Sequence, residues 1–126
     1  DQIFLFSMSM PGLTKLARNQ LLVDYDFFCF DADGCLWDAN EPIAGATALI
    51  SALLEKNKRV FIVTNNCTKT QSEYVKKMRT LGFGDIAERS IITPAVVLVD
   101  LLKRHHSKYA SKAIYVSGSK TLAKSL

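Results

Sequence analysis

The sequence has 126 residues, 48% hydrophobic and 22% charged, with only 6 Gly and 3 Pro; this suits one globular domain and excludes a disordered or collagen-like chain. No apolar run approaches the roughly 18 residues that span a bilayer, so a membrane protein is excluded. The net charge of +4 comes from scattered Lys and Arg without interleaved aromatic residues, which argues against nucleic-acid binding and suits a small anionic substrate.

The N-terminal residues 1–21 are expected to form an extension that precedes a core over residues 22–126. Residues 1–10 contain an apolar patch but no basic region and no adequate apolar segment, so we do not expect a signal peptide. The three cysteines, an odd number without C-x-x-C spacing, fit a reducing compartment better than a disulfide framework or a zinc site. The expected location is therefore the cytoplasm.

The remaining sequence alternates between strand and helix patterns. The aromatic run 26–30 and the β-branched run 59–64 are typical of strands buried in a parallel sheet. The helix between them, over 45–56, is expected to bury Ala48, Leu49, Ala52 and Leu53. A second amphipathic helix is predicted over 70–81, with Tyr74, Val75, Met78 and Leu81 facing inward and Gly82 at its end.

The last third of the chain continues the alternation. We predict a short strand or turn at 90–93, a helix over 94–102 capped by Thr93, a strand at 113–116 and a helix over 120–126. Strands separated by helices of this length imply right-handed crossovers. The predicted fold class is therefore α/β, with an open parallel sheet covered by helices on both faces.

Polar residues follow two of the predicted strands, where such sheets bind ligands. Asp31 and Asp33, with Gly34 after them, come directly after the first strand, and Thr64 lies 33 residues further on, about one βαβ unit away. Paired carboxylates can hold Mg²⁺, and one can attack phosphorus while the other handles the leaving group's proton. The simpler reading of D-x-D alone is turn chemistry, but Thr64, Asn65 and Asn66 one crossover later favour a catalytic site.

Two stretches carry a resemblance to a known family. FCFDADGCLWDANEPIAGA (28–46) and VFIVTNNCTKT (60–70) resemble motifs one and two of the haloacid-dehalogenase-like phosphatases, in the phosphoglycolate and para-nitrophenyl phosphatase branch. The similarity covers residues 22–126. It implies a Rossmann-like three-layer core, present here in part, without the cap and the C-terminal part of the core.

The resemblance also implies an activity and roles for individual residues. Asp31 would be the nucleophile that forms an aspartyl-phosphate, and Asp33 the general acid and base. The Asp31 carboxylate and the Asp33 backbone carbonyl would hold Mg²⁺, and Thr64, Asn65 and Asn66 would bind the phosphoryl group. An aspartate at position 33 favours a phosphatase over the transport ATPases of the superfamily. The implied substrate is a small phosphate ester such as 2-phosphoglycolate or an aryl phosphate.

An alternative function follows from what the sequence does not contain. The family's cap, its motif-three lysine and its motif-four aspartates would follow the predicted strand at 113–116, and the 126 residues end before them. The chain could therefore be a catalytically incompetent fragment or short form that binds phosphate or self-associates. An unpaired sheet edge beside the first strand would allow two copies of the chain to pair as a homodimer.

Other motifs are assigned lesser roles. Gly118 to Thr121 resembles the end of a P-loop but lacks the required glycine spacing, and it is interpreted as a turn. His105 and His106 near a helix end suggest interaction with the helix dipole. Trp37 is equally compatible with the core and with a substrate entrance. Cys35 and Cys67 follow the two strand ends and are interpreted as packing residues, with a reactive thiol as the alternative.

Overall fold

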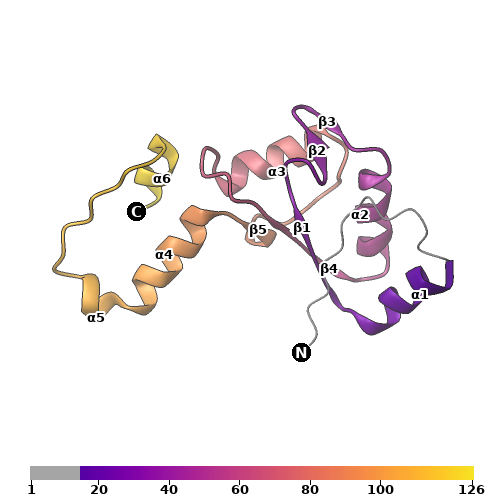
Figure 1. Cartoon of the computed structure of the whole chain (residues 1–126), viewed down its shortest axis with the longest axis horizontal. Coiled ribbons are helices and arrows are strands. Elements are labelled where there is room, and N and C mark those ends of the chain that lie inside the picture. The colour runs from indigo at the N-terminus through magenta and orange to yellow at the C-terminus, as the bar shows by residue number, and fades with distance from the viewer. Residues whose placement is uncertain (1–14) are drawn as a thin grey trace.

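The computed structural model describes residues 15–126 as an α/β fold (Figure 1). The expectation for residues 1–10 lies outside this range. None of the described helices is long and apolar enough to cross a membrane. The elements, in chain order, are α1 (Lys15–Asp24), β1 (Phe27–Asp31), β2 (Trp37–Asp38), β3 (Glu41–Pro42), α2 (Ala46–Glu55), β4 (Arg59–Val63), α3 (Gln71–Thr80), a 3-10 turn η1 (Glu88–Ser90), β5 (Ile91–Ile92), α4 (Pro94–Arg104), α5 (His106–Tyr109) and α6 (Lys120–Ser125).

The main sheet has the strand order β1-β4-β5, and both pairings are parallel. The register of β1 and β4 runs from Phe27 opposite Arg59 to Asp31 opposite Val63, so the two strands end level with each other. A separate antiparallel pair, β2 and β3, forms a small hairpin after β1. The predicted α/β class with a parallel sheet is confirmed.

Only one face of the sheet is covered by helices in the part of the chain that the structure describes. Both crossovers lead in the same direction along the sheet, and right-handed connections then place α2 and α3 on the same face. On the other face Phe27 is 56% exposed, Val63 is 41% exposed and Cys29 is exposed. The prediction of helices on both faces is wrong for the described residues. The core on the covered face comprises Ala32, Leu36, Trp37, Ala46, Ile50, Leu53, Val60, Ile62, Tyr74, Met78, Phe83, Ile86 and Ile91.

The buried face of α2 differs from the predicted one. Of the four residues in the predicted stripe only Leu53 is buried, whereas Leu49 is 41% exposed. The helix instead buries Ala46 and Ile50, which with Leu53 follow the i, i+4, i+7 spacing of one helical face. The polar residues of the helix do not fix its rotation, because Thr47 and Ser51 are half-buried while the apolar Leu49 is exposed; packing against the sheet determines the rotation.

Helix α3 is capped at both ends, by Thr70, which the sequence analysis placed inside the helix, and by the predicted Gly82. The Thr70 hydroxyl accepts a hydrogen bond from the Glu73 backbone N–H, and the Glu73 carboxylate accepts one from the Thr70 backbone N–H, which forms a capping box. After the helix, Gly82 adopts φ 84°, the left-handed conformation that favours glycine. The inward-facing Tyr74 and Met78 are buried as predicted. The caps and this buried face hold α3 rigidly over the sheet.

The predicted strand at residues 113–116 does not form. This segment has no partner strand, and Ile114 and Tyr115 are 51% and 93% exposed. Helix α4, which begins as predicted with Thr93 as its N-cap, leads the chain away from the sheet, and α5 turns it further (Figure 1). The segment therefore passes far from any strand edge, and its apolar sequence cannot produce a strand without a partner.

The corrected face of α2 can be tested with two neighbouring residues. We expect Ile50→Ala to lower the free energy of unfolding by about 2–5 kcal/mol, because it leaves a cavity in the core. Leu49→Ala, next to it on the exposed face, should lower it by less than about 1 kcal/mol. Urea unfolding of both variants measures the difference. Equal losses would contradict the assigned helix rotation.

Candidate active site

The turn after β1 presents two exposed carboxylates. Asp31 is the last residue of the strand, and both Asp31 and Asp33 are exposed on either side of the fully buried Ala32. The Ala32 carbonyl accepts hydrogen bonds from the backbone N–H groups of Leu36 at 2.9 Å and Trp37 at 3.4 Å. Gly34, at φ 81°, donates its N–H to the Trp37 carbonyl at 2.7 Å. The turn is therefore closed by its own backbone, which leaves both carboxylates available.

Thr64 follows β4 and lies beside this turn. Because Asp31 is in register with Val63, the next residue, Thr64, falls at the same end of the sheet. Its side chain is buried, and its hydroxyl accepts a hydrogen bond from the Asn66 N–H at 3.1 Å. The hydroxyl proton remains available to a phosphoryl oxygen. The structure thus brings Asp31 and Thr64 together, as the strand-end argument predicts.

The two asparagines after Thr64 are placed differently. Asn66 is half-buried, and its side-chain carbonyl accepts hydrogen bonds from the Thr68 N–H at 2.9 Å and the Thr68 hydroxyl at 2.6 Å. This contact closes the loop and leaves the amide nitrogen as the donor of Asn66. Asn65 is exposed. The loop can therefore offer donors from Asn66 and from the backbone to an anion at the strand ends, whereas the role of Asn65 stays a prediction.

Two residues that the sequence analysis did not assign to the site contact Asp33. The Trp37 indole Nε1–H donates a 2.7 Å hydrogen bond to Asp33 Oδ1, and the Lys77 ammonium lies 3.9 Å from the same oxygen. Trp37 is fully buried, so it is a core residue whose polar edge reaches the site. Lys77 lies on α3, 44 positions beyond Asp33, and no sequence motif marks it.

Tyr74 places an unpaired hydroxyl behind the two strand ends. The side chain is 1% exposed, its ring stacks on Trp37 with centroids 6.3 Å apart, and its hydroxyl has no hydrogen-bond partner among the described residues. Burial raises the pKa of the Tyr74 phenol; the nearby Thr64 side chain lowers it in part, although it makes no well-formed hydrogen bond, and the charges of Asp33, Cys67 and Asp31 raise it again. Three of the predicted site residues, Asp31, Asp33 and Thr64, therefore lie near enough to this hydroxyl to influence its pKa.

The cysteines near the site differ in exposure from Cys29, which lies on the open face of the sheet. Cys35 and Cys67 are both half-buried. Burial raises the pKa of the Cys35 thiol, and the Asp31 carboxylate raises it further, although the Asp31 backbone N–H opposes this in part. A raised pKa keeps the thiol protonated and slows its reaction with oxidants. This supports packing over reactivity for Cys35.

The oxygen donors at the turn match the preference of Mg²⁺ for hard ligands. The backbone hydrogen bonds that close the turn are accepted by the Ala32 carbonyl and not by the Asp33 carbonyl. The Asp33 carbonyl could therefore bind a cation together with the Asp31 carboxylate. Across the described residues no group of three or more His, Cys, Asp or Glu could form a complete metal cage. Because Mg²⁺ retains several waters and binds through one or two carboxylates plus substrate phosphate, this smaller donor set fits it.

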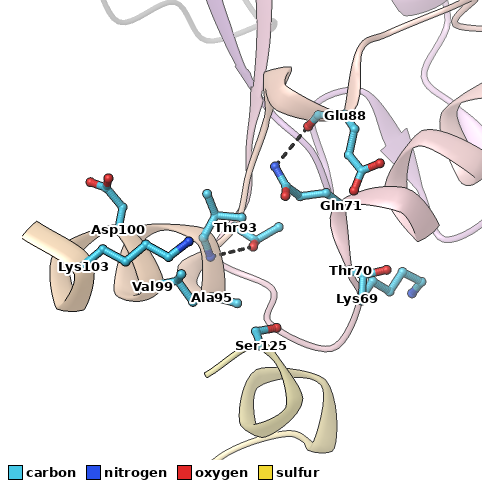
Figure 2. Close-up of a pocket in the computed structure, with 11 residues that line it drawn as sticks. Lys69, Thr70, Gln71, Glu88, Thr93, Ala95, Val99, Asp100, Lys103 and Ser125 are labelled. Carbon is cyan, nitrogen blue, oxygen red and sulfur yellow. Dashed lines mark hydrogen bonds between the residues drawn. The ribbon is translucent and has the colours of Figure 1, made fainter. Parts of the chain in front are cut away.

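A pocket of about 390 Å³ lies elsewhere, between the start of α3, the 3-10 turn, α4 and α6 (Figure 2). Its polar groups are largely paired with each other: the Gln71 amide donates to the Glu88 and Ile91 carbonyls, and the Thr93 hydroxyl caps α4. Neither aspartate of the β1 turn lines it. We therefore do not assign the reactive site to this pocket, since it lies apart from the β1 turn.

Comparison with known proteins identifies the family to which this fold and the two strand-end motifs belong. A model of the haloacid dehalogenase-like hydrolases matches residues 28–126, and the chain belongs to this family. It is 34% identical over 118 residues to human glycerol-3-phosphate phosphatase, covering 90% of this chain and 37% of that protein. It is 43% identical over 116 residues to a Caenorhabditis elegans protein whose name places it among NipSnap proteins, covering 91% of this chain and 22% of that one.

A solved structure gives the same assignment. The 4-nitrophenylphosphatase of Thermotoga maritima superposes with a TM-score of 0.71 at 25% identity, over 83% of this chain and 39% of that chain. The chain thus spans well under half the length of each of these relatives. The family and the parallel fold are shown, and the similarity lies in the part that carries the β1 and β4 strand ends.

The unpaired hydroxyl of Tyr74 gives a stability prediction. Tyr74→Phe should leave the free energy of unfolding unchanged within about 1 kcal/mol or raise it slightly, because no hydrogen bond is lost. Tyr74→Ala, which empties the same site, should cost about 3–5 kcal/mol. Chemical unfolding of the two variants provides the measurement. A loss above about 2 kcal/mol in the Phe variant would mean that the hydroxyl has a partner.

The pKa direction of Cys35 predicts its labelling behaviour. Between about pH 7 and 10, the midpoint for iodoacetamide alkylation of Cys35 should lie higher in the folded chain than in the urea-unfolded chain. The folded state holds this proton more tightly, so the group's contribution to stability is present below the unfolded pKa and is lost as the pH rises through the folded value. Mass spectrometry of the Cys35 peptide gives both midpoints. A lower midpoint in the folded chain would show an activated thiol.

Proposed function

We propose that the protein is a Mg²⁺-dependent phosphomonoester hydrolase that works through an aspartyl-phosphate on Asp31. The observation that supports this most strongly is the level ending of β1 and β4, which puts Asp31 and the buried Thr64 at the same edge of the sheet. Family membership supports the same reaction class. A nucleophile next to a hydrogen-bond donor for the phosphoryl oxygens is the minimum that phosphoryl transfer requires.

The reaction follows from the placement of the two carboxylates. A carboxylate oxygen of Asp31 attacks phosphorus while the bond from phosphorus to the ester oxygen breaks, and protonated Asp33 gives its proton to that departing oxygen. Asp33, now a carboxylate, takes a proton from water as the water oxygen attacks the aspartyl-phosphate. Inorganic phosphate leaves, and Asp31 is restored as a carboxylate. Thr64 and Asn66 hold the phosphoryl oxygens by hydrogen bonds throughout.

The proposal assigns Mg²⁺ to the Asp31 carboxylate and the Asp33 backbone carbonyl. When bound there, the ion would neutralise phosphoryl charge that otherwise repels the attacking carboxylate. The Asp33 side chain stays outside this ligand set, which keeps it free for proton transfer.

The proposed substrate is a small phosphate ester, such as 2-phosphoglycolate or an aryl phosphate. Relatives named as glycerol-3-phosphate, phosphoglycolate and 4-nitrophenyl phosphatases support this class and add glycerol 3-phosphate to the esters to be assayed. The net charge of +4 favours anionic substrates in general. A cytosolic setting is part of the proposal and rests on the three free cysteines.

Substitution of the two aspartates tests the proposal. Asp31→Asn should abolish turnover, and Asp33→Asn should lower kcat/KM for alkyl phosphates by about 10²- to 10⁴-fold but for 4-nitrophenyl phosphate by less than about tenfold. The ratio kcat/KM covers the steps through departure of the leaving group, and 4-nitrophenolate needs little protonation to leave. Asp38→Asn, an exposed aspartate on the nearby hairpin, is the matched control and should behave as wild type.

The kinetic assays should compare the 126-residue chain with any longer natural form that contains it. We expect the 126 residues alone to show negligible 4-nitrophenyl phosphate hydrolysis, because the resemblance implies a further lysine and further aspartates that no described residue matches, and one such group can be worth about 10²- to 10³-fold. Turnover near that of an ordinary phosphatase, abolished by Asp31→Asn, would overturn this expectation. Phosphate binding without turnover in every form would instead favour the non-catalytic alternative.

A further inference from the structure

Lys77 joins three parts of the molecule through one ammonium group. Its Nζ donates a 2.8 Å hydrogen bond to the Ala39 carbonyl, lies 4.7 Å from the centre of the Trp37 ring and lies 3.9 Å from Asp33 Oδ1. Ala39 belongs to the tip of the β2-β3 hairpin, and Lys77 itself lies on α3. A single side chain therefore connects the helix, the hairpin and the carboxylate proposed as the general acid and base.

The surroundings of Lys77 distinguish it from an ordinary solvated lysine. Its side chain is only 16% exposed, whereas the neighbouring Lys76 on the same helix is exposed. Burial lowers the pKa of Lys77, and the Asp33 carboxylate opposes this shift. Partial burial of an ammonium group is unfavourable unless its partners replace water, and the carbonyl, the indole ring and the carboxylate together do so.

The hairpin tip requires a contact of this kind. Ala39 has φ 48°, in the left-handed region that is unfavourable for a residue with a Cβ atom. The hairpin contains only two paired residues in each strand, Trp37 with Pro42 and Asp38 with Glu41. So short a hairpin is marginal by itself. The hydrogen bond from Lys77 to the Ala39 carbonyl ties the tip to the rigidly capped α3.

Asp33 is held on one side of its carboxylate. Both the Trp37 indole N–H and the Lys77 ammonium approach the same oxygen, Oδ1, rather than one oxygen each. Fixing one oxygen restricts the rotation of the carboxylate and leaves the other oxygen to exchange a proton.

We propose that Lys77 is a positioning residue that, together with Trp37, fixes the Asp33 carboxylate through Oδ1 and the β2-β3 hairpin through Ala39. The catalytic consequence rests on the proposed function, because it concerns proton transfer by Asp33. The structural consequence, a fixed hydrogen bond between the Trp37 indole and Asp33, does not depend on activity.

The chain contains a single tryptophan, which makes this hydrogen bond directly observable. The ¹⁵N-labelled 126-residue chain gives one indole N–H resonance by NMR, and its exchange with solvent reports the Trp37 to Asp33 bond. Lys77→Met keeps the length of the apolar stem but removes the charge and the donor, and we expect indole exchange to become about tenfold faster.

Lys77→Arg should restore slow exchange, and Lys76→Met is the matched control that should not change it. Thermal unfolding of each variant checks its fold, and Lys77→Gln replaces Lys77→Met if the latter does not fold.

A kinetic measurement tests the catalytic consequence separately, in whichever form of the protein hydrolyses phosphate esters. Lys77→Met should lower kcat/KM about tenfold for glycerol 3-phosphate and much less for 4-nitrophenyl phosphate, with rescue by Lys77→Arg. Equal losses for both esters would mean that Lys77 does not act through Asp33. Unchanged indole exchange in Lys77→Met would overturn the proposal as a whole. Absence of turnover in every wild-type form, including a longer natural form, would instead contradict the proposed function. The indole result would then decide the positioning role.

Discussion

The parallel pairing of β1 with β4 is the constraint on which the rest of the site depends. Its register ends both strands at the same level, with Asp31 opposite Val63, so the residues that follow must share one edge of the sheet. Parallel strands need a crossover, and here α2 supplies it and packs Ile50 and Leu53 against the buried face of the sheet. A shift of this register by one residue would move Asp31 away from Thr64 and reverse the faces of β1.

The sequence predicts the parts of this fold that local patterns determine. The strands β1 and β4, the glycine after α3, the N-cap of α4 and the common sheet edge of Asp31 and Thr64 all follow from short-range chemistry. The rotation of α2 does not, because its half-buried Thr47 and Ser51 do not mark the solvent side of the helix. The segment at 113–116 shows that strand composition without a partner does not form a strand. Lys77 was missed for a related reason: its role depends on a contact to Ala39, 38 positions earlier, that only the tertiary structure creates.

The polar groups of the site are supported by an aromatic cluster rather than by further polar residues. Trp37 stacks on Tyr74 and meets the Phe83 ring edge-on at 5.9 Å, and all three side chains are buried. Close-packed rings have few alternative arrangements, so the indole N–H points to Asp33 without a competing partner. The covered face of the sheet thus provides both the core and the rigid backing of the reactive turn.

The residues at the candidate site come from one continuous part of the chain. Asp31, Asp33, Thr64, Tyr74 and Lys77 all fall within one βαβα segment that ends with α3. The open face of the sheet exposes Phe27 and Val63, and the alternation along β1 places Asp31 on the same face as Phe27. The placement of the proposed nucleophile Asp31, of Thr64 and of Lys77 is therefore set by β1, β4, α3 and the hairpin.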